Sequence, residues 1–225
     1  MLQAATLLLS LLTSPAPQAT AQTTARAPQN APADIIATLR SHLLTMLQQD
    51  QTARGLAGIP SSSTGPAVAS NLTEIDAVLT KQLKDIVAQR GWPTVALVGP
   101  EASKAATLLL GHTTDLAWRK SLLPQLTTLA DRREIDPAQL AIVIDKQLVA
   151  EGKPQRYGTQ FKMVDGQMAM ISVEDPGGLD ALRARALLPP MDAYKQTLVR
   201  MYHLKVSNKI ASPPEPASAT PAAAP

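Results

Sequence analysis

Two ionisable side chains in this sequence, His112 and Asp145, are candidates for general acid–base catalysis because of their positions. His112 follows Gly111 at the expected end of a helix, where loops present functional groups more often than helix interiors do. A histidine there can exchange a proton near pH 7, or it can simply be a partner of the helix dipole. The second side chain, Asp145, lies in a run of apolar residues, so it needs a hydrogen-bonding partner if it is buried.

A polar loop follows the helix of Asp145 and contains the strongest local group of candidate ligand-binding residues. Gln155, Tyr157, Gly158, Thr159 and Gln160 bring together a phenol, a hydroxyl, two amides and a flexible glycine. Such a loop can hold several hydrogen-bonding groups against a ligand, because the glycine allows close approach of the backbone. Alternatively, these side chains only satisfy the end of the helix and the start of the next strand.

The elements that must position these residues follow from the spacing of apolar residues. Helical spacing and capping residues predict helices at about 34–54, 73–90, 101–110, 116–132, 136–151, 175–188 and from 191 onwards. Asp165-Gly166, between two short apolar stretches, predicts a β-hairpin near 159–173. The sequence therefore predicts a mainly α (α+β) fold, a single helical domain at 34–210 with about six to seven helices and one β-hairpin.

Three local features sharpen this prediction. Apolar residues surround nearly the whole helix at 136–151, which predicts a central, buried helix with Asp145 inside its apolar arc. Thr73-Glu74-Ile75-Asp76 resembles a capping box that opens the helix at 73–90. Pro124 is expected to kink the helix at 116–132 or to split it in two.

The two ends of the chain differ in composition from the folded part. A short apolar run, Leu2–Leu12, is followed by the small-residue pattern Ala19-Thr20-Ala21, which predicts a signal peptide over 1–21, cleaved near Ala21. The protein is therefore expected to be secreted or periplasmic. No Lys or Arg precedes the apolar run, which leaves a disordered apolar tail as the alternative. Residues 22–33 and 211–225, rich in Ala and Pro, are predicted to be a disordered linker and a disordered tail.

Composition excludes several classes of chemistry. The 225 residues contain no cysteine, which excludes disulfides, a thiol nucleophile and cysteine-ligated zinc or iron–sulfur sites. No pair of histidines has metal-ligand spacing, and no phosphate-binding or dinucleotide-binding loop is present, so neither a metal nor a cofactor is predicted. Only 3% of the residues are aromatic and no nucleic-acid-reading motif occurs, so no nucleic-acid partner is expected.

Basic residues gather in one segment. The formal net charge of the chain is +3, and residues 180–210 contain only Asp180 and Asp192 as acidic residues. This segment could make weak contact with anionic surfaces, or it could be an ordinary solvated helix face. Its basic residues are Arg183, Arg185, Lys195, Arg200, Lys205 and Lys209.

Several of these residues, taken together, resemble a known family. They are Asp50-Gln51 with Arg54, Gly91-Trp92-Pro93, Gly99, His112, Asp145, Gln155, Tyr157-Gly158-Thr159-Gln160, and Arg183 with Tyr194. The pattern resembles the bacterial domain of unknown function 6624 family over most of the folded region. The chain has Gly111, Lys146 and Leu187 where that family usually has Gln, Arg and Gly. The resemblance implies no reaction and no ligand.

The buried helix and the resemblance together suggest one arrangement of the polar residues. Asp145 is expected to face His112, Arg183 and the Tyr157 loop, with a bidentate Asp145–Arg183 pair that lowers the pKa of the carboxyl group. Arg183 is therefore a further candidate ligand-binding residue.

Three functions are compatible with this arrangement. The first is a module that binds an unknown small molecule or an envelope component through the Tyr157–Gln160 loop. The second is a hydrolase-type enzyme with His112 as general base, oriented by Asp145. The third is a structural envelope protein. The oligomeric state is left open.

Overall fold

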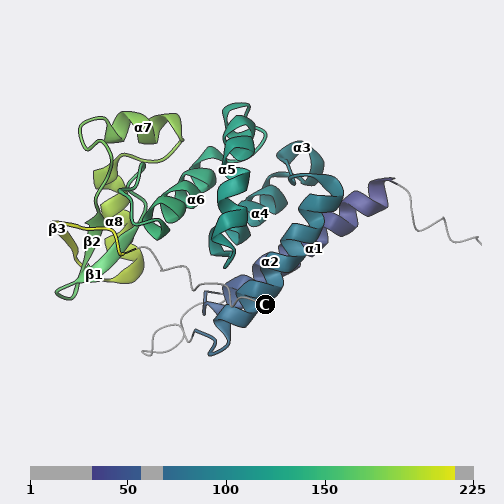
Figure 1. The fold of residues 1–225 in the computed structure, drawn as a ribbon, viewed down its shortest axis with the longest axis horizontal. Helices are drawn as coiled ribbons and strands as arrows, with labels where there is room; N and C mark the ends of the chain where they lie inside the picture. Colours follow the sequence, from purple (N-terminus) through teal and green to yellow (C-terminus); the bar gives the residue numbers. More distant parts are fainter. Residues whose placement is uncertain (1–31, 57–67, 216–225) are drawn as a thin grey trace, which may run out of the picture.

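The computed structural model describes residues 32–56 and 68–215, which form eight helices and one three-stranded sheet (Figure 1). The predicted signal peptide, most of the predicted linker and residues 216–225 of the predicted tail lie outside the described residues. In chain order the elements are α1 (Pro32–Ala53), α2 (Leu72–Arg90), α3 (Val95–Val98), α4 (Pro100–His112), α5 (Leu116–Asp131), α6 (Pro137–Ala150), β1 (Phe161–Val164), β2 (Gln167–Ile171), α7 (Leu179–Arg185), α8 (Met191–Tyr202) and β3 (Val206–Ala211). The mainly α prediction is confirmed.

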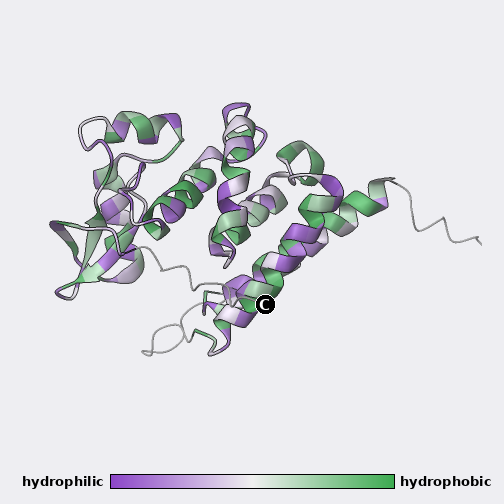
Figure 2. Cartoon of the chain, in the orientation of Figure 1, coloured by the Kyte–Doolittle hydropathy of each residue, from purple (hydrophilic) through white to green (hydrophobic). Residues whose placement is uncertain are grey.

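The helices are arranged around α4 and α6. Figure 1 shows α1 and α2 at one end of the molecule and the sheet with α8 at the other, with α4, α5 and α6 between them. Helix α4 packs against α1, α2, α3 and α6, and α6 also packs against α5. Figure 2 shows α6 as mostly hydrophobic, whereas hydrophilic and hydrophobic residues alternate along α1 and α2. The central position of α6 follows from its apolar circumference, as predicted.

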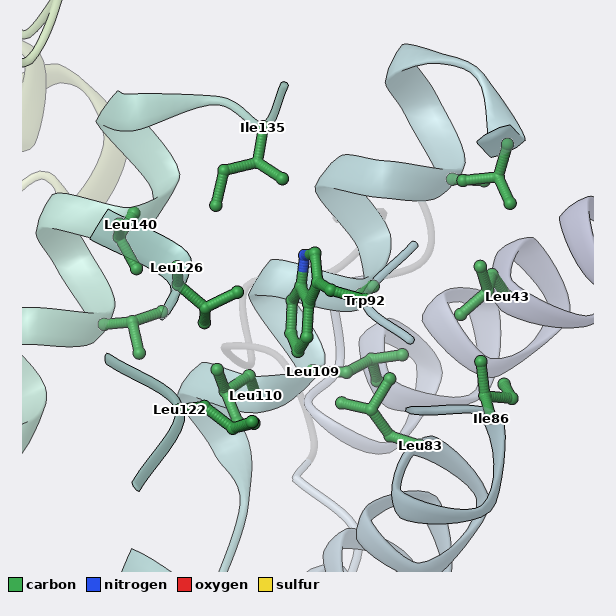
Figure 3. Packing of buried hydrophobic residues seen from close by; sticks show 14 of the residues in the cluster. Leu43, Leu83, Ile86, Trp92, Leu109, Leu110, Leu122, Leu126, Ile135 and Leu140 are labelled. Carbon is green, nitrogen blue, oxygen red and sulfur yellow. The ribbon is translucent and has the colours of Figure 1, made fainter. Parts of the chain in front are cut away.

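Trp92 lies within the main hydrophobic core, between the helices. Its side chain is 4% exposed and lies among leucine and isoleucine side chains of several helices (Figure 3). Gly91, just before it, has a φ of 73°, which lets the chain turn sharply at the end of α2. The Gly-Trp-Pro turn therefore ends one helix and anchors the next segment in the core.

Local sequence signals predicted the start of α6 correctly but failed in part at α2 and α5. Asp136 accepts a hydrogen bond from the N–H of Ala138 at 2.9 Å and starts α6, as predicted. The predicted capping box at Thr73 is wrong, because α2 already begins at Leu72 and the Asp76 carboxylate binds Arg54 instead. Helix α5 continues through Pro124, so the predicted alternative of two separate helices is also wrong.

The hairpin turns at Asp165-Gly166, as predicted, and a third strand extends the sheet. Phe161 pairs with Met170, and the turn residues Asp165 and Gly166 have φ values of 50° and 73°, as a tight hairpin turn requires. Strand β3 then pairs with β2 in parallel, which the sequence did not predict. The expected last helix instead ends at Tyr202. Among the described helices, none has the length and the apolar composition needed to cross a membrane.

Candidate functional site

Two polar clusters lie on different sides of α6, because adjacent residues of a helix point in directions about 100° apart. Asp145 contacts the loop that follows α6, whereas Lys146 contacts the end of α4. The sequence analysis expected one cluster that joined His112, Asp145 and Arg183. The structure separates them into a loop cluster, at Asp145, and a histidine cluster, at His112.

In the loop cluster, the Asp145 carboxylate is fully buried and accepts hydrogen bonds from Arg156, Tyr157 and Thr159. Its Oδ1 accepts the backbone N–H groups of Arg156 at 2.7 Å and Tyr157 at 2.9 Å. Its Oδ2 accepts the backbone N–H and the hydroxyl of Thr159, both at 2.9 Å. Burial raises the pKa of the Asp145 carboxyl group, and these hydrogen bonds oppose the rise. The carboxylate therefore fixes the conformation of the loop.

The predicted ion pair between Asp145 and Arg183 is wrong. Arg183 is fully buried and donates from Nε to the carbonyl of Pro189 at 2.7 Å, and from Nη1 to the carbonyl of Tyr157 at 2.6 Å. Its guanidinium carbon also lies 4.8 Å from the centre of the Tyr194 ring. Because the loop N–H groups and the Thr159 hydroxyl already occupy both Asp145 oxygens, Arg183 binds a carbonyl of the same loop instead. The predicted lowering of the Asp145 pKa is also wrong, because burial raises this pKa and outweighs the hydrogen bonds of the loop.

Most of the other candidate ligand-binding residues also bind within the protein. Gln155 is fully buried, with Oε1 accepting the N–H of Gln160 at 2.7 Å and Nε2 donating to the carbonyl of Ile171 at 2.6 Å. Gly158 has a φ of 69°, and a Cβ there would lie 2.5 Å from the Met191 side chain, so protein atoms fill the space beside it. The glycine is thus required by the fold.

Two parts of this loop do reach cavities. Thr159 and Gln160 line a hollow of about 360 Å³ between the hairpin and α8. Tyr157 lines a separate cavity of about 190 Å³, together with residues of α5, α6 and α7. Ligand binding by this loop remains a prediction.

In the histidine cluster, His112 pairs with a carboxylate of α1. The Nδ1 atom of His112 lies 2.7 Å from Oδ1 of Asp50, which is fully buried. A carboxylate with a low pKa only accepts hydrogen bonds, so Nδ1 carries the proton and Nε2 holds the lone pair. No hydrogen bond to Nε2 comes from the part of the chain that the structure describes. The expected orienting role of Asp145 is therefore wrong, and Asp50 has this position.

Arg54 joins Asp50 to α2. It follows Asp50 by one helical turn, and its Nε lies 3.0 Å from Oδ1 of Asp50 and equally far from Nδ1 of His112. Because Nδ1 carries a proton, the Nε–H group donates to Asp50. Nη2 of Arg54 donates to Oδ1 of Asp76 at 2.6 Å. These contacts fix the relative positions of α1, α2 and α4 around the histidine.

Burial and charge set the protonation states of the cluster. Burial lowers the pKa of His112, as do the charges of Lys146 and Arg54, and together these outweigh the opposing effect of Asp50. Burial raises the pKa of Asp50, but the hydrogen bonds and charges of His112 and Arg54 outweigh burial and bring it below its ordinary value. Near pH 7 the pair is therefore an ionised carboxylate with a neutral imidazole.

Lys146 brings a second proton donor to the same place. Its Nζ donates to the carbonyl of Gly111, the residue before His112, at 3.3 Å. Burial and the charges of Arg54 and Arg119 lower the pKa of Lys146 to about 8. The ammonium group of Lys146 therefore loses its proton more readily than that of an ordinary lysine, and it lies near a histidine that can accept a proton.

The chemical capacity of the cluster depends on its access to solvent. The side chains of His112 and Arg54 are 18% and 19% exposed, whereas that of Asp50 is 0% exposed. The imidazole of His112 is thus partly exposed, and its Nδ1 atom is held by a buried carboxylate. General bases in enzymes are often oriented in this way. Within residues 32–56 and 68–215, no group of three or more Asp, Glu or His side chains is placed to bind a metal ion.

The sequence analysis identified His112 but not its partners. Asp50 and Arg54 were visible only as an i, i+4 pair and as part of the family resemblance, and Asp76 was assigned to a helix cap. Lys146 was noted only as a departure from the family pattern.

The comparisons with known proteins place the chain in one family. A family model described as a family of unknown function, DUF6624, matches residues 37–207. No curated protein and no solved structure matches the chain. The family match covers most of the chain and includes both polar clusters. The chain therefore belongs to the domain of unknown function 6624 family, as the resemblance predicted.

Proposed function

We propose that this member of the domain of unknown function 6624 family is a hydrolase-type enzyme in which Nε2 of His112 is the general base. The supporting observation is the 2.7 Å contact between His112 Nδ1 and the buried Asp50 carboxylate, which leaves Nε2 as the basic nitrogen. The expected general base is retained, with Asp50 in place of Asp145 as the group that orients it.

The proposed reaction uses water as the nucleophile. Neutral His112 removes a proton from a water molecule through Nε2, and the resulting hydroxide adds to an acyl or phosphoryl centre. The ionised Asp50 stabilises the imidazolium that forms. The bond from this centre to the leaving group then breaks, and the leaving group receives a proton from the imidazolium or from the ammonium group of Lys146. In the second case, the imidazolium then returns its proton to the Lys146 amine.

Lys146 has two properties that suit this role. Below a pH of about 8 its ammonium group is charged, so it can stabilise negative charge that develops on the substrate. Its pKa is also close enough to neutral for proton donation. Activity should therefore rise as His112 loses its proton and fall as Lys146 loses its own.

A ligand-binding role of the Tyr157–Gln160 loop is the second candidate function. Its support is the hollow of about 360 Å³ that Thr159 and Gln160 line. It ranks lower because Gln155, Gly158 and Arg183 are held by contacts within the protein. Secretion or a periplasmic location stays a prediction from residues 1–21, and a structural envelope role depends on it.

Chemical modification tests the proposed base directly. Diethyl pyrocarbonate acylates neutral imidazole nitrogens, and peptide mass spectrometry can follow its reaction with His112, His42 and His203 separately. His42 and His203 are exposed and serve as internal references. We expect His112 to be modified at pH 7 although it is largely buried. A His112 that stays unmodified while the two references react would contradict the proposal.

A substrate panel tests the reaction class. The panel consists of p-nitrophenyl acetate, p-nitrophenyl phosphate and bis(p-nitrophenyl) phosphate, which cover acyl and phosphoryl centres. Hydrolysis should be lost in His112→Ala and strongly reduced in Asp50→Asn, but kept in the control His203→Ala. Hydrolysis that survives His112→Ala would contradict the assignment of the base.

A further inference from the structure

The end of α8 exposes apolar side chains next to basic ones. Every residue from 199 to 205 is exposed. Met201 is 64% exposed and Tyr202 55% exposed, and Leu204 follows them just beyond the helix. Exposed apolar side chains that lie together, in contrast to single ones, indicate a surface that contacts another apolar phase.

This surface continues onto the hairpin. Tyr202 and Leu204 line the hollow of about 360 Å³ together with Lys162 and Met163 of β1. Met163 is itself 53% exposed. Residues 162–163 and 199–205 therefore form one surface, which we call the α8 tip.

The charge of the α8 tip has a single sign. Residues 193–210 contain no Asp or Glu, whereas Lys162, Arg200 and Lys205 all belong to the tip. Arg200 donates to the hydroxyl of Thr197, which carries no charge. Lys209, further along β3, is paired with Asp165 at 3.0 Å, so it contributes less to the field. The tip therefore combines aromatic and aliphatic side chains with positive charge, and in the part of the chain that the structure describes no carboxylate pairs with Arg200 or Lys205.

We propose that the α8 tip docks onto an anionic lipid surface. Met201, Tyr202 and Leu204 enter the boundary between headgroups and acyl chains, and Arg200 and Lys205 contact lipid phosphates. A second copy of the chain is disfavoured as the occupant, because a symmetric contact would bring positive charges against each other. The lipid-binding surface is therefore smaller than the predicted basic segment 180–210. Arg183, for example, is buried and cannot contact lipid.

Vesicle sedimentation of the full chain tests the proposal. The probes are vesicles of phosphatidylcholine alone and of phosphatidylcholine with 30 mol% phosphatidylglycerol. We expect sedimentation only with the anionic vesicles, and its loss at high salt. Arg200→Glu with Lys205→Glu, and separately Tyr202→Ser with Leu204→Ser, should each weaken binding by at least about tenfold.

A matched control keeps the test specific. Lys104→Glu with Arg132→Glu changes the net charge by the same amount at exposed positions of α4 and of the end of α5. This control should bind as the unchanged protein does, and residues 1–31 are the same in all variants. Equal loss in the control, equal binding to both kinds of vesicle, or no binding to either would overturn the proposal. So would dimerisation in solution that the Tyr202→Ser, Leu204→Ser variant abolishes.

Discussion

Replacing Lys146 with methionine should stabilise the protein at pH 7 and weaken any activity of the His112 site. Methionine keeps most of the aliphatic volume but removes a charge that α6 holds beside Arg54 and Arg119. The pKa of Lys146 falls from 10.5 to about 8. This difference corresponds to roughly 3 kcal/mol of cost for the charged form. Because Lys146 is partly exposed and its hydrogen bond to Gly111 is lost, we expect a net gain of about 1–2 kcal/mol.

The pH dependence of this gain identifies its cause. The pKa of Lys146 in the folded state lies below its value in the unfolded chain, so the unfolded state binds more protons between about pH 8 and 10.5. The unfolding free energy of the unchanged protein should therefore rise through this range because of Lys146. The advantage of Lys146→Met should be full below pH 8 and should shrink as the pH approaches 10.5.

Urea denaturation of both proteins at several pH values between 7 and 10 measures this difference, because other titrating groups contribute equally to both. Lys104→Met, at an exposed position of α4, is the matched control and should change stability by less than about 0.5 kcal/mol at every pH. A Lys146→Met variant that is less stable at pH 7, or that keeps a constant advantage from pH 7 to 10, would refute the reasoning.

Four further outcomes follow from the two clusters. Asp145→Asn should lower the unfolding free energy by about 2–4 kcal/mol, because an amide NH2 group then faces the N–H groups of the loop. The control Asp131→Asn, at an exposed position, should lower it by less than about 0.5 kcal/mol. Equal urea denaturation curves for the two variants would contradict this. Gly158→Ala should cost about 1–2 kcal/mol at a φ of 69°, measured by thermal unfolding, and an unchanged Tm would disagree. Asp50→Asn should lower the pKa of His112 further in an NMR titration, and a rise would oppose the pairing. The pKa of His112 is lower in the folded state than in the unfolded chain, so the contribution of neutral His112 to stability should be present above about pH 6.5. This contribution should be lost as the pH falls through the pKa of His112 in the folded state. An acid unfolding curve identical to that of His112→Gln would contradict this.

Local patterns predicted the elements whose signals are local. The Asp165-Gly166 pair predicted the hairpin, and the cap at Asp136 predicted the start of α6. Strand β3 was missed because its partner, β2, lies about forty residues earlier, and no local signal records a parallel pairing over that distance. The helical spacing of apolar residues in α8 continues past Tyr202, so it did not predict that the helix ends there.

The candidate site shows a similar limit. Helical periodicity correctly predicted that Asp145 is buried, but it could not predict the partner, because the loop donates mainly backbone N–H groups, which every residue type except proline carries. The pairing of His112 with Asp50 joins residues 62 positions apart. It depends on how α4 packs against α1, which residue spacing does not determine.

The tautomer and pKa of His112 test the central claim most directly. Long-range ¹H–¹⁵N correlation spectroscopy distinguishes the two imidazole nitrogens, and the loss of signals in His112→Gln assigns them. We expect a proton on Nδ1, a bare Nε2 near pH 7 and a pKa of His112 below the ordinary value of 6.5. A proton on Nε2, or a histidine that is still charged at pH 7, would contradict the assignment of His112 as the general base.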